Sequence, residues 1–565
     1  MTVKRNLLFQ LLVIAALVMG ACSEDVDDGN GNTGGGNEGD KPAVEDVVDK
    51  VSQYEARKFD GEKRAGVFYE IFVRSFADSD GDGVGDLNGI TAKLDYLDDL
   101  GVSGIWLTPI HPSDSYHGYD VIDYKGVNAD FGTMEDFEKL IAEAHKRDIR
   151  VILDYVLNHS SKLNPWFKEA CADANSPYRK FYNFTKEDRS GQHGWHKVTT
   201  GGVQYWYFGD FDSSMPDLNY GPAASCATNP TFLALVDAAK FWIDKGVDGF
   251  RLDAVKHIYD NQTSSENPTF LNTFYTTLNN YFQGKSALGF KDLYMVGECW
   301  MGTADMAKYY KGLPALFDFT AWENWMLYAI KNSHAKWFPK DIVGAQAEYK
   351  KYRADYIHAT KLSNHDEHRA RTALGGSNAL SLERAKMAGA ILLTSSGSPF
   401  IYYGEEIGMM GDKSTGDENV REPMLWAPKA EDTYRTTWMK AQNNFDLGPG
   451  TVKTLAEDEK SIYNVYRKFM RLRNTYPALA EGKMELPDGF SDSDTNNKQV
   501  MVFYRTAGAE RLLVVHNVSE KQSTHTVKHA IKAPVADMNG VKVESKSATE
   551  HVLTMPAYST IIIEL

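Results

Sequence analysis

Short apolar runs recur eight times between Val67 and Tyr403, and amphipathic helical stretches separate most of them. Within those stretches, apolar residues lie three or four positions apart, as they do on one face of a helix. This alternation predicts an α/β fold of parallel strands covered by helices. Eight such units fit a closed (β/α)8 TIM barrel better than an open doubly wound sheet. The predicted strands are Val67–Ser75, Gly104–Pro109, Arg150–Val156, Gly249–Ala254, Leu293–Glu298, Ala315–Phe319, Thr360–Asn364 and Pro399–Tyr403.

Two regions depart from this repeat. After the third predicted strand comes a long segment rich in aromatic residues, Asn, Gly and Ser, with no clear helical period, which predicts an inserted subdomain. After a predicted helix from Ser461 to Leu472, alternating segments such as Gln499–Tyr504 and Leu512–His516 predict a C-terminal β-sandwich. The predicted domains are 63–158 and 230–482 for the barrel, 159–229 for the insert and 483–565 for the sandwich.

The N-terminal residues predict an export signal. Lys4 and Arg5 precede an apolar run that is too short to span a membrane but suits the core of a signal peptide. Residues 19–22, Met-Gly-Ala-Cys, resemble a bacterial lipoprotein cleavage box, so residues 1–21 are the predicted signal peptide and Cys22 the lipidated N-terminus. A simple secretory signal with an incidental cysteine is the alternative.

Residues 22–62 predict a flexible tether, because the Gly, Asn and Asp that dominate its first part leave little to bury. The acidic residues directly after Cys22 resemble the signal that sends some lipoproteins to the outer face of the outer membrane. We therefore expect a lipid-anchored protein of the outer membrane, exposed at the cell surface.

The net charge and the cysteine content limit which ligands, metal sites and disulfides are expected. A net charge of −16 repels nucleic-acid phosphates, so nucleic-acid binding is not expected. The aromatic content of 12% offers rings on which sugars can stack. Cys171, Cys226 and Cys299 contain no CxxC pair, so neither a zinc site nor a disulfide framework is predicted. A Cys171–Cys226 disulfide stays open, since the sequence does not give the distance between them.

Three carboxylates lie where a TIM barrel builds its active site, at the C-terminal ends of strands. Asp253 and Glu298 lie at the ends of the fourth and fifth predicted strands, and Asp366 comes just after the seventh. A retaining glycosidase needs an ionised carboxylate as nucleophile and a protonated one as acid and base. Arg251 points to the same side as Asp253, so Asp253 is the predicted nucleophile. Glu298, with no adjacent cation in sequence, is the predicted acid/base, and Asp366 is left to bind substrate hydroxyls and stabilise positive charge.

An acidic loop follows the first predicted strand. Acids and glycines alternate along it, which suits oxygen coordination of a hard cation. It is not an EF-hand, because Gly89 occupies the twelfth position. The sequence predicts Ca²⁺ as cofactor, bound by Asp78, Asp80, Asp82, Asp86 and the carbonyl of Val84.

Four segments carry a family resemblance: Asp154–His159, Gly249–His257, Val296–Trp300 and Leu362–Asp366. They are similar to the motifs of the α-amylase family, glycoside hydrolase family thirteen, and the resemblance extends over nearly the whole chain from Gly66. Further similar segments are Gly104–Pro109, Met215–Asn219 and Gly397–Gly408.

The resemblance implies substrate-binding roles for Tyr119, His159, Arg251, Lys256, His257 and His365. His159 and His365 would hydrogen-bond hydroxyls of the sugar in the −1 subsite, Tyr119 would stack on that sugar, and Arg251 would support the nucleophile. The Lys-His pair would bind glucose on the leaving-group side. Family members also carry a calcium after the first strand, and many carry a second between barrel and insert, whose insert ligands cannot be matched here.

The implied activity is retaining, endo-acting hydrolysis of internal α-1,4-glucosidic bonds in starch and maltooligosaccharides. Met215–Asn219 mixes features of amylases, neopullulanases and oligo-1,6-glucosidases, and Arg421–Trp426 resembles a stretch of the latter two groups except at Glu422. A neopullulanase-like or oligo-1,6-glucosidase-like specificity is therefore the alternative. A non-catalytic starch-binding surface protein would predict a damaged acid triad, and all three acids are present. An outer-membrane glycan uptake complex is a further expected partner.

Overall fold

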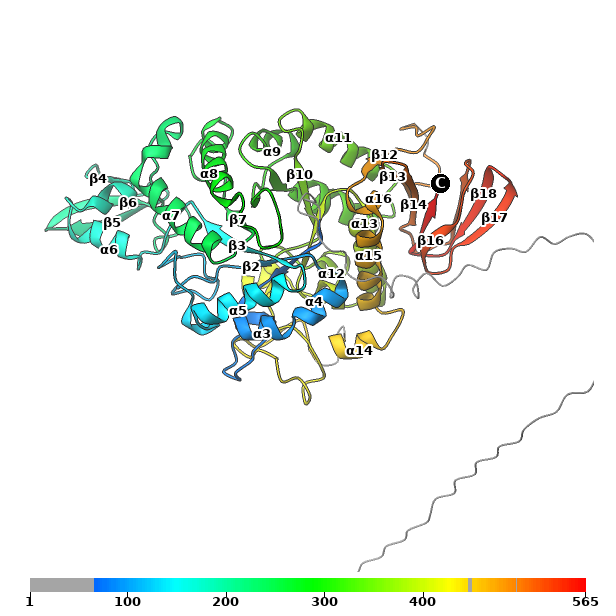
Figure 1. Ribbon diagram of the computed structural model, residues 1–565, viewed down its shortest axis with the longest axis horizontal. Coiled ribbons are helices and arrows are strands. Elements are labelled where there is room, and N and C mark those ends of the chain that lie inside the picture. The colour runs from blue at the N-terminus through cyan, green and yellow to red at the C-terminus, as the bar shows by residue number, and fades with distance from the viewer. Residues whose placement is uncertain (1–65, 446–449, 494) are drawn as a thin grey trace, which may run out of the picture. The chain divides into compact units, whose positions relative to one another are not determined.

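The computed structural model describes residues 66–445, 450–493 and 495–565, so the predicted signal peptide, tether and Cys22 lie outside the described residues. Eight parallel strands close into a barrel in the order β1-β11-β10-β9-β8-β7-β3-β2 (Figure 1). The predicted TIM barrel is thereby confirmed. Its strands are β1 Phe68–Ile71, β2 Gly104–Leu107, β3 Arg150–Val156, β7 Gly249–Asp253, β8 Tyr294–Gly297, β9 Ala315–Phe317, β10 Ile357–Lys361 and β11 Ser398–Tyr402.

Helices follow most of these strands and supply the crossovers between them. The main ones are α3 Leu87–Ala92, α4 Leu94–Leu100, α5 Met134–His145, α7 Pro230–Asp244, α8 Glu266–Phe282, α9 Thr303–Tyr309, α11 Phe338–Lys350, α13 Ala379–Thr394 and α15 Ile462–Thr475. The residues at the N-terminus of a helix explain where it begins. At α7, the Asn229 side chain accepts from Thr231 N at 2.8 Å and Pro230 occupies the first turn.

Two strands differ most from their predicted bounds. β1 ends at Ile71, because the chain turns there into the short helix α2, Val73–Phe76. β10 covers Ile357–Lys361 rather than 360–364, and the Asn364 side chain accepts from Asp366 N at 2.9 Å, which forms a turn after the strand. Asp366 therefore lies in a loop beyond β10.

The barrel interior changes from apolar to charged along its axis. Phe68 of β1 and Ile152 of β3 belong to an apolar cluster inside the barrel. Side chains two positions further along a strand point to the same face. Glu70, Asp154 and other buried charged side chains therefore form the next inward layer, toward the carboxyl ends of the strands.

The insert after β3 carries its own sheet. Its strands are antiparallel in the order β4-β6-β5. Their bounds are β4 Phe184–Thr185, β5 Trp195–Thr200 and β6 Val203–Phe208, and a helix, α6 Pro165–Ala172, precedes them. That helix was not predicted; Asn164 caps it and Pro165 starts it, although the segment lacks a long helical period.

Two antiparallel sheets at the end of the chain form the predicted sandwich, in the orders β12-β13-β14-β19-β16 and β15-β18-β17. Val515, Ile561, Val527 and Leu553 share the apolar core between the sheets. The bounds are β12 Lys483–Glu485, β13 Val500–Ala507, β14 Glu510–Asn517, β15 Ser523–Val527, β16 Pro534–Met538, β17 Lys542–Ser547, β18 Glu550–Met555 and β19 Ser559–Glu564.

Two buried arginines bind carbonyls at the C-terminal end of α13. Arg505 of β13 donates to Thr394 O at 2.6 Å, and Arg473 of α15 donates to Leu393 O at 3.0 Å and Ser395 O at 2.7 Å. The last carbonyls of a helix lack partners within it, so these bonds satisfy them. The bond from Arg505 also fastens the sandwich to the barrel.

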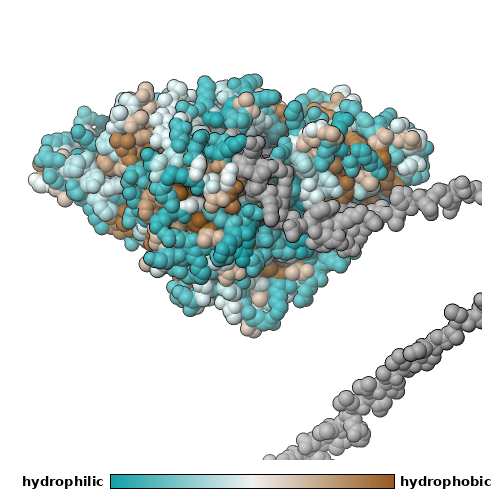
Figure 2. All heavy atoms as spheres, in the orientation of Figure 1, coloured by the Kyte–Doolittle hydropathy of each residue, from teal (hydrophilic) through white to brown (hydrophobic). Residues whose placement is uncertain are grey.

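The face drawn in Figure 2 is largely hydrophilic, with scattered apolar residues. No helix among the described residues is both long and apolar enough to cross a bilayer. Cys171, Cys226 and Cys299 are all free thiols, so a Cys171–Cys226 disulfide is not formed.

Candidate active site

A pocket of about 370 Å³ opens among the predicted site residues. Seven of the predicted residues line it: Tyr119, His159, Asp253, Lys256, His257, Glu298 and Asp366. Arg251 and His365 are fully buried and contact residues of the pocket wall. The structure thus brings the predicted catalytic and substrate-binding residues together in one place.

Arg251 is the hub of the acidic wall. Its Nη1 donates to Asp253 Oδ1 at 2.8 Å and to Asp154 Oδ1 at 2.9 Å, and its Nη2 lies 3.0 Å from Glu298 Oε2. Arg251 and Asp253 lie two residues apart on β7, which explains why both side chains point inward. One guanidinium therefore holds three carboxylates from three neighbouring strands.

This contact corrects one argument from sequence. Glu298 was expected to lack a cation beside it, yet it lies as close to Arg251 as Asp253 does, because β8 pairs with β7 in register. The guanidinium does not distinguish the two acids. Burial raises the pKa of Asp253, Arg251 opposes that rise, and the charge of Glu298 adds to it. Like charges that share one cation favour one ionised and one protonated carboxyl.

Buried His365 forms an ion pair with Asp366, which lines the pocket and is partly exposed. His365 Nδ1 lies 2.6 Å from Glu70 Oε1, and its Nε2 lies 2.9 Å from Asp366 Oδ2. Burial alone lowers the pKa of His365, but Asp366 and Glu70 outweigh it and raise the pKa to about 9. Burial likewise raises the pKa of Asp366, while His365, Arg421 and Lys413 together bring it well below its usual range. Asp366 is therefore anionic at neutral pH.

Tyr119 and His159 occupy the same wall. Tyr119 Oη lies 2.6 Å from His365 Nε2 and donates to Asp154 Oδ2 at 3.0 Å, which fixes its ring. His159 is buried, and burial lowers its pKa to about 4, so its ring is neutral. Within the described residues, its Nε2 has no hydrogen-bond partner although the residue lines the pocket. That nitrogen is available to a ligand hydroxyl.

The other side of the pocket carries exposed rings. Phe211 of the insert is 47% exposed, and its ring centroid lies 5.0 Å from that of His257. Trp300 is 46% exposed and stacks on Phe319, with 4.7 Å between the ring centroids. Lys256 Nζ donates to Trp300 O at 3.1 Å. Aromatic faces beside polar donors suit a sugar, which has apolar C–H faces and polar edges.

Sequence reasoning missed three side chains of the site. Asp154 bonds Arg251, Glu70 bonds His365, and Arg421 Nη2 donates to Asp366 Oδ1 at 2.8 Å. Glu70 and Asp154 carry a local signal, since each is a lone acid in an apolar strand, two positions from an inward apolar residue. Arg421 carries none, because it reaches the site from a distant loop.

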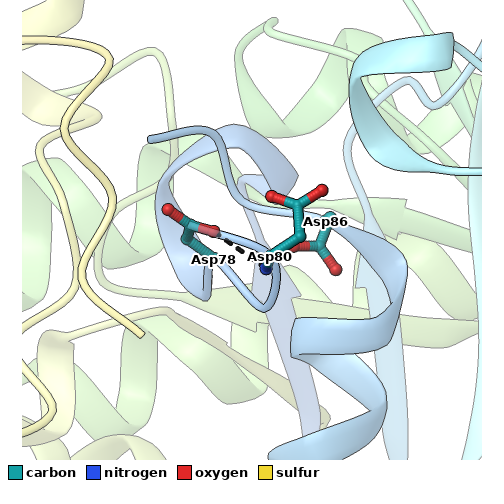
Figure 3. A group of neighbouring side chains, drawn as sticks. All are labelled: Asp78, Asp80 and Asp86. Carbon is teal, nitrogen blue, oxygen red and sulfur yellow. Dashed lines mark hydrogen bonds between the residues drawn. The ribbon is translucent and has the colours of Figure 1, made fainter. Parts of the chain in front are cut away.

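The acidic loop after β1 gathers three of the predicted metal ligands. Carboxylate oxygens of Asp78, Asp80 and Asp86 lie within 4.8 Å of one another (Figure 3). Gly81 and Gly83 have φ angles of 85° and 96°, so the tight turn depends on glycine. Asp82 is exposed, lies outside this group and accepts from Val84 N at 2.8 Å. An all-oxygen set of this kind fits calcium.

A second acidic pocket of about 230 Å³ lies beside His257. Asp210 and Asp217 of the insert line it together with Asp260. Burial raises the pKa of Asp217 to about 7. Among the described residues, the carboxylates of these three acids do not come together as a group that could hold a metal ion.

A TIM barrel whose strand ends present buried carboxylates, one arginine and histidines to a single pocket defines the class of glycoside hydrolases. Residues 70–482 match the family described as alpha amylase, catalytic domain, and residues 500–562 match the alpha-amylase SusG C-terminal domain. The chain therefore belongs to the α-amylase family.

Curated relatives and solved structures agree with this. The chain is 36% identical to "Alpha-amylase SusG" of Bacteroides thetaiotaomicron, with 90% of this chain and 92% of the relative covered. It is 31% identical to "Oligo-1,6-glucosidase" of Parageobacillus thermoglucosidasius, covering 81% and 90%. A crystal structure of an alpha-amylase from H. orenii superposes with a TM-score of 0.77 at 35% identity, covering 90% of this chain and all of that one.

Proposed function

We propose that this protein is a retaining, endo-acting α-amylase that hydrolyses internal α-1,4-glucosidic bonds of starch and maltooligosaccharides. One observation carries the proposal: Asp253 and Glu298, from the adjacent strands β7 and β8, line one pocket and bond to the same guanidinium. Retention needs two carboxyl groups about 5 to 5.5 Å apart. Two acids that bond to one guanidinium lie close together, which supports retention.

In the proposed reaction, Asp253 attacks the anomeric carbon while Glu298 donates its proton to the departing glycosidic oxygen. A covalent glycosyl ester forms on Asp253. Glu298, now ionised, takes a proton from water as the water oxygen attacks the anomeric carbon. The bond from that carbon to Asp253 breaks, which restores both carboxyl groups. Ala254 N donates to Glu298 Oε2 at 3.0 Å and holds that carboxyl in place. Anionic Asp366 stabilises the positive charge that develops on the sugar ring.

Substrate binding follows from the two walls of the pocket. His159 and Tyr119 bind the sugar whose bond is cut, and His365 reaches it if a hydroxyl replaces one of the Nε2 contacts to Tyr119 and Asp366. Lys256 and His257, beside the exposed ring of Trp300, bind the leaving-group side. A chain of sugars can therefore extend past the cleavage point.

The alternative is α-1,6 or mixed specificity. Relatives named oligo-1,6-glucosidases align over most of the chain, and the segment Arg421–Trp426 resembles theirs. Relatives named α-amylases, SusG and "Alpha-amylase 3" of Dictyoglomus thermophilum, have higher identities of 36% and 38%. That difference supports the amylase proposal.

The proposal includes a cofactor and a location. Asp78, Asp80 and Asp86 would hold Ca²⁺, with Asp82 and the Val84 carbonyl as further ligands after a small rearrangement. A lipid on Cys22 would anchor the enzyme to the outer membrane at the cell surface, next to a glycan uptake complex that takes its products. The lipid anchor rests on the sequence of residues 19–22 alone.

The deciding experiment is product analysis of the purified protein on amylose, pullulan and isomaltose, with Glu298→Gln as the control. Mixed maltooligosaccharides released from amylose as α-anomers, and absent with Glu298→Gln, support the proposal. Panose from pullulan or glucose from isomaltose supports the alternative. Binding of amylose without any product supports a non-catalytic starch-binding protein.

A further inference from the structure

The loop 410–422, which follows β11, brings two cations to Asp366. Arg421 Nη2 donates to Asp366 Oδ1 at 2.8 Å, and Arg421 Nε donates to His365 O at 2.9 Å. Lys413 Nζ lies 3.4 Å from the same oxygen of Asp366. The placement of this loop therefore sets the charge around an acid of the active site.

The residue after Arg421 is a fully buried carboxylate outside the pocket. Glu422 Oε1 accepts from Gln442 N at 2.6 Å, from Asn443 N at 2.8 Å and from Asn443 Nδ2 at 2.9 Å. Its Oε2 accepts from Asn444 N at 2.9 Å and from Asn444 Nδ2 at 2.8 Å. Five donors thus converge on one side chain, which binds the segment 442–444 to the end of the loop.

Asn444 bonds the beginning of the same loop. Met410 N donates to Asn444 Oδ1 at 2.8 Å, and Asn444 Nδ2 donates to Met410 O at 2.7 Å. Asn444 therefore joins Met410 to Glu422, the first and last residues of the loop. We call this arrangement of Met410, Asn444 and Glu422 the staple.

We propose that Glu422 is a positioning residue: through the staple it closes the base of the loop 410–422 and so sets Arg421 and Lys413 on Asp366. The inference deepens the proposed hydrolase function and rests on it. Ser75 Oγ donates to Arg421 O at 2.5 Å and Tyr402 Oη to Val420 O at 3.0 Å, so the last residues of the loop have other anchors. In the part before them, 410–419, Gly411 also bonds Thr372 Oγ1 and Arg369 N. The staple acts together with these bonds there and on the direction in which Arg421 enters the site.

Only a carboxylate fits this position. Both Glu422 oxygens face donors alone, so a glutamine must turn its NH2 group toward at least two of them, in either orientation. Glu422→Gln therefore breaks the staple with almost no change in volume. Glu418→Gln is the matched control, because Glu418 lies in the same loop but is exposed.

The first test is a double-mutant cycle of Glu422→Gln with Arg421→Met, with kcat and KM on amylose measured for each variant. We expect Glu422→Gln to lower kcat about 10- to 100-fold, as misplaced site groups do, and to add little when Arg421 is already Met. Equal losses in both backgrounds would overturn the proposal, as would an unchanged kcat in a folded Glu422→Gln protein.

The second readout is the pH profile. The charged groups facing Asp366 are His365, Arg421 and Lys413, with Asp417 and Asp253 nearby. If the staple positions the two cations of the loop, Glu422→Gln moves the acidic limb of kcat to higher pH. A role in stability alone would lower the melting temperature and leave this limb in place, which would contradict positioning.

Hydrogen exchange separates this inference from the proposed activity. Glu422→Gln should speed amide exchange in 410–419, and Glu418→Gln should not, whether or not amylose is the substrate. Unchanged exchange in Glu422→Gln would refute the staple. An inactive wild-type protein with faster exchange in this variant would refute only the amylase proposal.

Discussion

Glu70 and His365 lie 295 positions apart in the chain, yet their side chains meet at 2.6 Å in the buried interior of the barrel. The other ring nitrogen of His365 lies 2.9 Å from Asp366 Oδ2. A histidine between two carboxylates keeps its proton, because both charges stabilise the imidazolium. Glu70 therefore influences Asp366 without contacting the pocket.

Replacing Glu70 by Gln should shift activity and stability at alkaline pH. The pKa of His365, about 9, lies above its ordinary value of 6.5, so its stabilising charge is complete below pH 6.5 and is lost as the pH rises through about 9. Without the Glu70 charge that pKa falls, and the loss begins at lower pH. Profiles of kcat and of melting temperature up to about pH 10 measure this. Exposed Glu135→Gln is the control, and identical alkaline limbs would refute the prediction.

Glu298→Ala should lower kcat on amylose by about 10²- to 10⁴-fold, because general acid–base catalysis is lost. With an activated glycosyl donor that needs no protonation, added azide should restore turnover and yield the α-glycosyl azide, since the covalent ester on Asp253 still forms. Chromatography and NMR of the product check this. A β-glycosyl azide would instead assign the nucleophile to Glu298.

Chelation of calcium should lower the melting temperature by several degrees. A ligand present at 100 times its dissociation constant stabilises the folded state by about 2.7 kcal/mol. Asp78→Asn should abolish the difference between calcium and chelator, because Asp78 belongs to the group of three carboxylates. Asp82→Asn should reduce it less. Equal melting curves of the wild type with and without chelator would count against the site.

Glu405 should make the protein less stable as the pH rises. It is fully buried, and burial raises its pKa from 4.5 to about 8. A raised acid pKa contributes stability that is complete below about pH 4.5 and is lost as the pH rises through about 8. Glu405→Gln should flatten this dependence, since Tyr466 and Ser363 can still bond an amide, and one pKa unit corresponds to about 1.4 kcal/mol.

Urea unfolding at acidic and mildly alkaline pH measures the effect, and exposed Glu459→Gln serves as the control. A Glu405→Gln protein whose free energy of unfolding falls with pH as steeply as that of the wild type would contradict the burial argument.

The sequence was most informative where a single strand carries the information. The ends of β7 and β8 gave Asp253 and Glu298, and the two-residue spacing placed Arg251 beside Asp253. Contacts between strands could not be predicted from the sequence. The register in which β7 and β8 pair brings Arg251 to Glu298, and no local pattern shows that register. The bounds of β10 were wrong since Thr360–Asn364 has strand-like residues, while the side chain of Asn364 forms a turn.

Residues that meet across long stretches of the chain could not be predicted from the local sequence. Nothing near Asp366 indicates that Arg421 will cover it, and nothing near Glu422 predicts the segment 442–444. Asp78, Asp80 and Asp86 of the predicted metal loop do come together, because they lie close in sequence, while calcium binding there stays a prediction. The lipid anchor at Cys22 lies outside the described residues and stays a prediction.

The hydrogen bonds of Arg505 and Arg473 to the end of α13 limit how domains of this chain can be exchanged with those of relatives. A sandwich exchanged for one that lacks Arg505 would leave Thr394 O buried without its donor from β13. An unsatisfied buried carbonyl costs roughly 1 to 3 kcal/mol. The C-terminal domain is therefore not an interchangeable module but a structural part of the catalytic half, and viable chimeras should keep Arg505 and the last turn of α13 from the same parent.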